Sequence, residues 1–177
     1  METCAYLWCF QTVWKRGVKE VLFPALYSHS RECSYSGDRG SATGIVVCDM
    51  SSGVGRILDD NPIKIIPSQM FMGLKSLFFM SMVNNSLEQL PGSGLCTDTP
   101  ALNWLFLRQN EISVISENTF SSLRNLIELD LSGNKLHRLP ANIFQDLRSL
   151  ETLNLSGNNL SHIHPSQFDS LACVRSL

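Results

Sequence analysis

The sequence predicts an α/β solenoid, a stack of similar coils that share a short parallel sheet on a concave side. A segment at 126–134, LIELDLSGN, returns as LETLNLSGN at 150–158. The asparagine that ends this segment recurs every 24 or 25 residues, at Asn61, Asn85, Asn110, Asn134 and Asn158. A phenylalanine follows ten residues after four of them, at Phe71, Phe120, Phe144 and Phe168. A fixed period headed by L-x-x-L-x-L-x-x-N is typical of a leucine-rich-repeat horseshoe.

The alternating leucines at the head of each unit predict a short strand with its apolar side chains on one face. Parallel neighbours need a crossover of about a dozen residues or more, so the chain must return along the outer side. One coil alone cannot bury its leucines, and stacking therefore creates the core. The recurring asparagine lies where the backbone bends, and its amide both donates and accepts hydrogen bonds. We therefore predict that the five asparagines form a structural ladder.

The chain divides into two predicted parts. Residues 1–55 show no steady period, are rich in Ser and Gly after Ser34, and are expected to form a poorly ordered, non-repeat segment. Residues 56–177 are expected to form the solenoid, with about five repeats. Arg56 occupies a slot that should hold a core leucine. Neither end of the solenoid shows a cap, which favours a fragment or a truncated product.

Composition excludes several classes of function. The formal net charge is -2, which gives no reason to expect nucleic acid. No apolar run approaches the roughly 20 residues that a membrane span needs. The cysteines lack C-x-x-C spacing, and His162 and His164 have no ligand partner at a suitable spacing, so we expect no metal and no cofactor. No catalytic motif is present, and we expect no enzyme.

Three N-x-S triplets, at Asn84, Asn154 and Asn159, are glycosylation candidates that fit a secreted location. Repeats rich in asparagine also generate such triplets by chance. The triplets are therefore weak evidence for the compartment.

The alternate positions of each strand head should face the concave side. They place Trp104 and Phe106 on one strand, and Glu128 and Asp130 on the next. The two carboxylates should lie about 7 Å apart, close to the rise of about 5.4 Å per helical turn. This acidic pair suits two cations that lie one turn apart on a bound helix. The alternative is that the pair is merely solvated, or is neutralised by Arg108 on the adjacent strand.

The segments GLKSLFFMSMVNNSLEQLP, PALNW and ENTFSSLRNLIELDLSGN resemble the ectodomain of the relaxin-family peptide receptors. The resemblance covers about Ile57 to Leu177. It implies repeats that bind a basic helical peptide hormone of the relaxin/insulin-like family, followed by a G-protein-coupled membrane domain. It also implies that Glu128 and Asp130 match an acidic pair that holds arginines of the hormone. A second acidic pair of the family is replaced here by Phe106 and Arg108, as if one whole repeat were skipped.

Three functions follow as expectations. The first is hormone binding by a truncated receptor ectodomain; the parent would lie on the extracellular side of the plasma membrane, and this fragment would be secreted or retained. The second is an extracellular matrix or adhesion module that binds a protein partner through Trp104 and Phe106. The third is a non-functional splice product.

Overall fold

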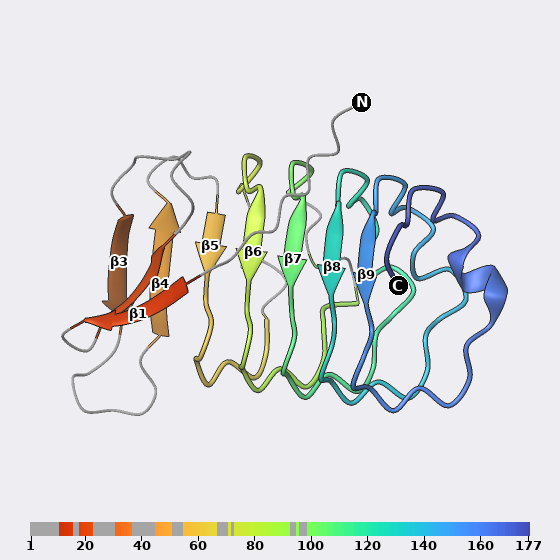
Figure 1. The fold of residues 1–177 in the computed structure, drawn as a ribbon, viewed down its shortest axis with the longest axis horizontal. Helices are drawn as coiled ribbons and strands as arrows, with labels where there is room; N and C mark the ends of the chain where they lie inside the picture. Colours follow the sequence, from red (N-terminus) through yellow and green to blue (C-terminus); the bar gives the residue numbers. More distant parts are fainter. Residues whose placement is uncertain are drawn as a thin grey trace.

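The computed structural model describes residues 11–15, 18–22, 31–36, 45–50, 55–66, 71, 73–92, 95 and 99–177. These residues contain nine strands and one 3-10 helix, shown in Figure 1. The strands are β1 (Gln11–Lys15), β2 (Val18–Leu22), β3 (Arg31–Ser36), β4 (Ile45–Met50), β5 (Gly55–Ile57), β6 (Phe79–Ser81), β7 (Trp104–Phe106), β8 (Glu128–Asp130) and β9 (Thr152–Asn154). The 3-10 helix η1 spans Pro165–Phe168.

Strands β3 to β9 form one sheet in chain order, side by side in Figure 1. From β5 to β9 the strands are parallel and in register, so that Leu105 pairs with Leu129, which pairs with Leu153. The predicted solenoid is therefore confirmed. Before it, β3 and β4 pair antiparallel, and β4 pairs antiparallel with β5. Both β3 and β4 lie within residues 1–55, for which the sequence predicts no repeat. The boundary at residue 55 and the expected poor order of that segment stay predictions.

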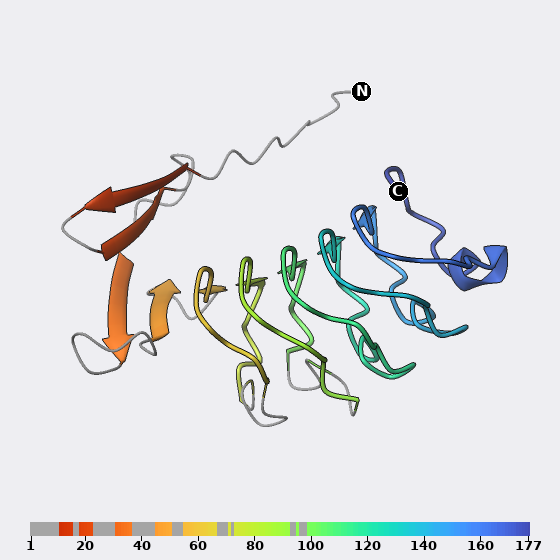
Figure 2. The same ribbon diagram turned by 90° about the horizontal axis from the view of Figure 1, so that it is seen from below.

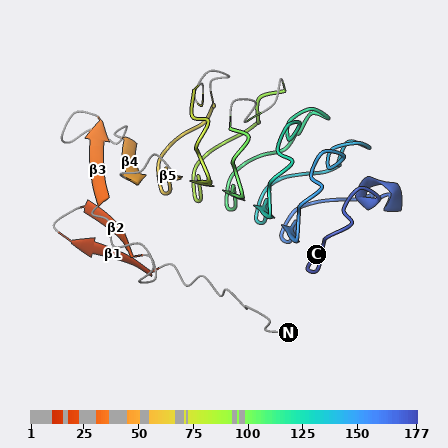
Figure 3. The ribbon, with the colours of Figure 1, turned by 90° about the horizontal axis from the view of Figure 1, so that it is seen from above.

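The sheet lies on the inner side of the stack. Figures 2 and 3 show the coils spreading apart from the closely spaced strands to the outer turns. Because the strands lie closer together than the outer turns, the stack curves and the sheet forms its concave face. In the described residues, the outer side consists of turns and η1 and holds no α-helix, so the helical part of the expected α/β architecture is reduced to that single short turn.

The core is built from equivalent residues of successive coils. Leu105, Leu129 and Leu153 are at most 1 % exposed, and Phe120 and Phe144 fill the outer half of their coils. In the coil after β6 the phenylalanine slot belongs to Leu95, which is 3 % exposed. A fully buried leucine contributes about 1.5–3 kcal/mol, so this repeated burial is the main stabilising term.

The unusual residue at the start of the solenoid is Arg56. It pairs in register with Met80, and Met80 pairs with Leu105. Arg56 therefore holds the slot that is apolar in the following coils, as the sequence predicted. It is only partly buried, whereas Met80 has no exposed surface.

The ladder asparagines join each coil to the one before it. The side-chain nitrogen of Asn134 donates to the carbonyl groups of Leu107 and Leu131 at 3.0 and 2.9 Å. Its side-chain oxygen accepts from the backbone N–H of Ile112 at 3.1 Å. Asn85, Asn110 and Asn158 make the same kind of bonds one coil apart. Backbone groups that the bend leaves without partners are thereby satisfied inside the stack.

The residue just before each ladder asparagine has a left-handed backbone. Its φ lies between 54° and 66° in all five coils, at Asp60, Asn84, Gln109, Gly133 and Gly157. Glycine adopts this conformation without strain, whereas other residues pay a steric cost. The coils with Gly133 and Gly157 are thus the least strained at this bend.

At this left-handed position, removing a glycine should lower stability and introducing one should raise it. Gly133→Ala is expected to lower the free energy of unfolding by about 1 kcal/mol, because alanine is strained at positive φ. The new Cβ would lie 3.5 Å from Gln109 atoms, an ordinary contact, so the loss arises from the backbone and not from a clash. Gln109→Gly should raise the free energy of unfolding by about 0.5 kcal/mol. Urea titrations of both variants check this, and equal losses in the two would contradict it.

Candidate binding surface

Six side chains of β7, β8 and β9 line the concave face over the last three strands of the sheet. The register places Trp104, Glu128 and Thr152 in one row. The second row holds Phe106, Asp130 and Asn154. All six are partly exposed, while the leucines between them face the core. We call these six residues the concave floor.

The floor has an apolar side, because aromatic rings from β6 and β7 pack edge to face. The ring centroids of Phe78 and Trp104 lie 4.5 Å apart at an interplanar angle of 67°. Those of Phe79 and Phe106 lie 5.5 Å apart at 65°. Phe79 also packs with Ile57 and is only 6 % exposed. These contacts hold Trp104 and Phe106 in place while leaving part of each ring accessible.

Next to the aromatic rings lies the acidic pair, Glu128 and Asp130. One carboxylate oxygen of Asp130 accepts from the backbone N–H of Ser132 at 2.9 Å. In the described part of the chain, Arg108 forms no ion pair with either carboxylate. Two ion pairs of the described residues lie elsewhere, between Lys135 and Glu111 and between Arg175 and Glu151. Direct pairing of Arg108 with Glu128 or Asp130 is thus not seen in these residues, and neutralisation of the pair by Arg108 stays an alternative.

Burial beside neutral neighbours raises the pKa of Glu128, and the nearby charge of Asp130 raises it further. The residues in register with Glu128 are Trp104 and Thr152, neither of which carries a charge. Holding Glu128 ionised therefore costs the folded state some free energy. A bound cation would remove that cost.

The raised pKa of Glu128 predicts a pH dependence of stability. The unfolded carboxyl ionises near 4.5 and the folded one at higher pH, so stability should fall as pH rises through this interval. Above this pH interval the full free-energy cost of ionised Glu128 is present. Below pH 4.5 the carboxyl is protonated in both states, so the cost vanishes. Glu128→Gln should therefore be more stable than the unmodified chain at neutral pH and equal to it in acid. Thermal unfolding between about pH 4 and 7 measures the stability difference between the variant and the unmodified chain. A difference that grows toward acid pH would refute the prediction.

The glycosylation candidates lie in different places. Asn84 lies exposed at a bend, where its side-chain nitrogen donates to Asp60 at 2.8 Å. Asn159 is exposed on a turn, with its side-chain nitrogen 3.1 Å from Nδ1 of His137. Asn154 belongs to the concave floor, beside Asp130.

Other residues singled out by sequence lie away from the floor. His162 and His164 are exposed, and each ring contacts a nearby serine hydroxyl. The described residues bring together no group of three or more metal-ligating side chains. Cys173 is an exposed free thiol, whereas Cys96 lies outside the described residues.

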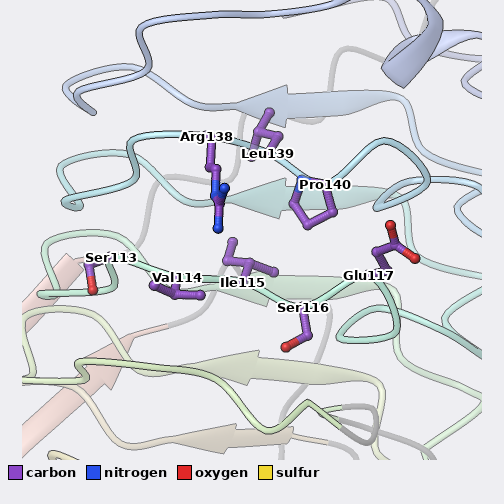
Figure 4. A pocket seen from close by; sticks show the side chains of 8 residues that line it. All are labelled: Ser113, Val114, Ile115, Ser116, Glu117, Arg138, Leu139 and Pro140. Atoms are coloured by element: carbon purple, nitrogen blue, oxygen red, sulfur yellow. The ribbon is translucent and has the colours of Figure 1, made fainter.

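Sequence reasoning missed a groove of about 400 Å³ between the turns that follow β7 and β8. Figure 4 shows the side chain of Arg138 extending toward the coil that carries Val114 and Ile115. The groove is lined by Ser113, Val114, Ile115, Ser116, Glu117, Arg138, Leu139 and Pro140. The signal in the sequence was the apolar Val114 in a slot that the next coil gives to Arg138. The structure shows that Val114 is 60 % exposed. The groove is separate from the concave floor.

Comparison with known proteins agrees with this architecture. Residues 92–136 and 124–177 each match the leucine-rich repeat family profile. The fold is a leucine-rich-repeat solenoid. Domains of this fold are typically protein-binding and generally non-enzymatic. No curated protein matches this chain.

Three solved structures show the likeness. The leucine-rich-repeat domain of APL1B is 27% identical with a TM-score of 0.59, over 64% of this chain and 35% of that one. The LRIM1/APL1C complex gives 30% identity and a TM-score of 0.60, over 64% of this chain and 21% of that chain. The protein LIC12759 of Leptospira interrogans gives 31% identity and a TM-score of 0.62, over 70% and 30%. This chain thus spans about a fifth to a third of each similar chain. Among the described residues, no helix has the length and apolar character that crossing a membrane requires.

Proposed function

We propose that the concave floor binds a basic helical peptide of the relaxin/insulin-like hormone type. In this proposal the chain is the extracellular leucine-rich-repeat part of a G-protein-coupled receptor. The observation that carries the proposal is the acidic pair Glu128 and Asp130, which is partly buried and has no cationic partner in the described residues. The pair lies beside the rings of Trp104 and Phe106, which we call the aromatic shelf. The resemblance to the relaxin-family receptors supports the same partner.

The geometry suits two cations on one helix. Glu128 and Asp130 alternate on β8 and face the same side, so their Cα atoms lie about 7 Å apart. Successive turns of a helix are separated by about 5.4 Å, which flexible arginine side chains can match. Trp104 and Phe106 offer apolar surface beside the charges, and aromatic residues often anchor interfaces of this kind. A ligand should therefore combine two arginines with apolar residues on one helical face.

The aromatic shelf alone supports a second candidate, an adhesion module that binds a neutral protein surface. Trp104 and Phe106 are partly exposed and are held by edge-to-face packing. Trp104→Ala would weaken binding in both cases. Only the hypothesis of a basic helical peptide also predicts that binding weakens as salt is added, because salt screens the charge contacts.

The proposal is tested with two synthetic helical peptides that differ only at two positions one turn apart. One peptide carries arginine at both positions, and the other carries glutamine. Surface plasmon resonance with the immobilised chain should give an affinity for the arginine peptide at least tenfold higher, or about 1.4 kcal/mol. The preference should shrink between low salt and physiological salt. Equal affinities at low salt would overturn the proposed function.

A further inference from the structure

The three N-x-S triplets differ in what their side-chain nitrogens do. A glycan is attached through this nitrogen, so any hydrogen bond that it makes is disturbed by the modification. The nitrogen of Asn84 donates to Asp60, and that of Asn159 contacts His137. In the described residues, the nitrogen of Asn154 makes no hydrogen bond. The folded chain therefore accommodates a glycan at Asn154 with the smallest loss of its own contacts.

The amide of Asn154 is also held in one orientation. Its side-chain oxygen accepts from the backbone N–H of Ser156 at 3.1 Å and from the hydroxyl of Ser156 at 2.8 Å. With the oxygen held by these two donors, the nitrogen is turned away from Ser156. Asn154 is partly exposed on the concave side of the sheet.

We propose that Asn154 carries an N-linked oligosaccharide and that this glycan limits access to the concave floor. In the transfer, the side-chain nitrogen attacks the first sugar of a lipid-linked oligosaccharide diphosphate. A carbon–nitrogen bond forms, the carbon–oxygen bond to the diphosphate breaks, and the amide loses one proton. The lipid diphosphate is the leaving group. The consequence for binding rests on the proposed function, whereas the modification itself rests only on exposure to the secretory pathway.

The strand register explains why a glycan on Asn154 would limit access to the concave floor. Asn154 pairs with Asp130, and neighbouring strands lie about 4.8 Å apart. The first sugars therefore lie beside Asp130 and obstruct approach from the β9 side. The side bounded by Trp104 and Phe106 stays open. A helical partner would then have to enter over the aromatic shelf, and affinity for the acidic pair would depend on the state of the glycan.

The test uses the full chain, secreted from mammalian cells behind an added leader. Glycopeptide mapping by mass spectrometry should find an oligosaccharide on Asn154. Ser156→Ala removes the attachment signal and keeps the asparagine; it should tighten binding of the arginine peptide by about tenfold. Asn154→Gln, which also prevents attachment, should give the same gain. Asn159→Gln removes a triplet in the same coil away from the floor and should leave affinity unchanged.

Each outcome decides one part of the inference. An unmodified Asn154 in chains glycosylated at Asn84 or Asn159 would overturn the site. An occupied Asn154 whose loss leaves affinity unchanged would overturn the control of access. Absence of peptide binding by both the glycosylated and unglycosylated chains would count against the proposed function, while the mapping would still decide the modification. Circular dichroism confirms that the variants are folded.

Discussion

Reversing both charges of the acidic pair, with Glu128→Lys and Asp130→Lys together, is expected to weaken binding of the arginine peptide by at least about 100-fold. Each substitution replaces an attraction with a repulsion, and like charges brought together across an interface cost several kcal/mol. Both carboxylates are partly buried beside neutral residues, so solvent screens them less than a fully exposed pair. Surface plasmon resonance at low and physiological salt measures the loss.

A matched control carries the same change of net charge away from the floor. Glu88 and Glu117 are exposed and lie outside the concave floor, and Glu88→Lys with Glu117→Lys should change the affinity less than about threefold. The neutral variant Glu128→Gln should fall between the unmodified chain and the reversed one. If the control pair weakened binding as much as the floor pair, general attraction between net charges would explain the affinity and the floor would have no special role.

Asn134→Ala is expected to produce the largest loss of stability, about 3–5 kcal/mol. It removes the donor to the carbonyl groups of Leu107 and Leu131 and the acceptor for the N–H of Ile112. Asn134 is only 6 % exposed, so water cannot replace these partners without entering the stack. Each buried polar group left without a partner costs about 1–3 kcal/mol. Denaturant unfolding monitored by circular dichroism measures the change.

Asn159→Ala is the control for this experiment, because it deletes the same amide from an exposed turn of the next coil. It should change the free energy of unfolding by no more than about 0.5 kcal/mol. In a repeat fold each coil contacts only its neighbours, so Asn134→Ala should also lower the denaturant m-value if the last coils unfold first. Similar losses in the two variants would show that the ladder bonds contribute little.

Sequence could predict the features that each coil specifies by itself. The position of Asn134 in the period implied a bend with backbone groups to satisfy, and the structure places its amide on them. The slots of Leu129 and Phe144 implied burial, because a coil that exposed them would have no core to join. Glu128 and Asp130 could be placed on the concave side because side chains alternate along a strand.

Other features needed several coils in space. The burial of Phe79 comes from residues on two other strands, Ile57 and Phe106, and no local pattern reports it. The groove beside Val114 lies between residues 113–117 and 138–140, which belong to two adjacent coils. The raised pKa of Glu128 depends on which residues flank it across the sheet.

The sequence by itself determined the repeating coil, its ladder and the residues that face inward or outward, because these follow from a period read along the chain. Only the tertiary structure decided that Asn154 lies beside Asp130 and that, among the described residues, Arg108 makes no ion pair with the acidic pair and the Asn154 side-chain nitrogen makes no hydrogen bond. Side-chain direction and pairing depend on neighbours 24 or more residues away along the chain. Those neighbours come into contact only when the coils stack.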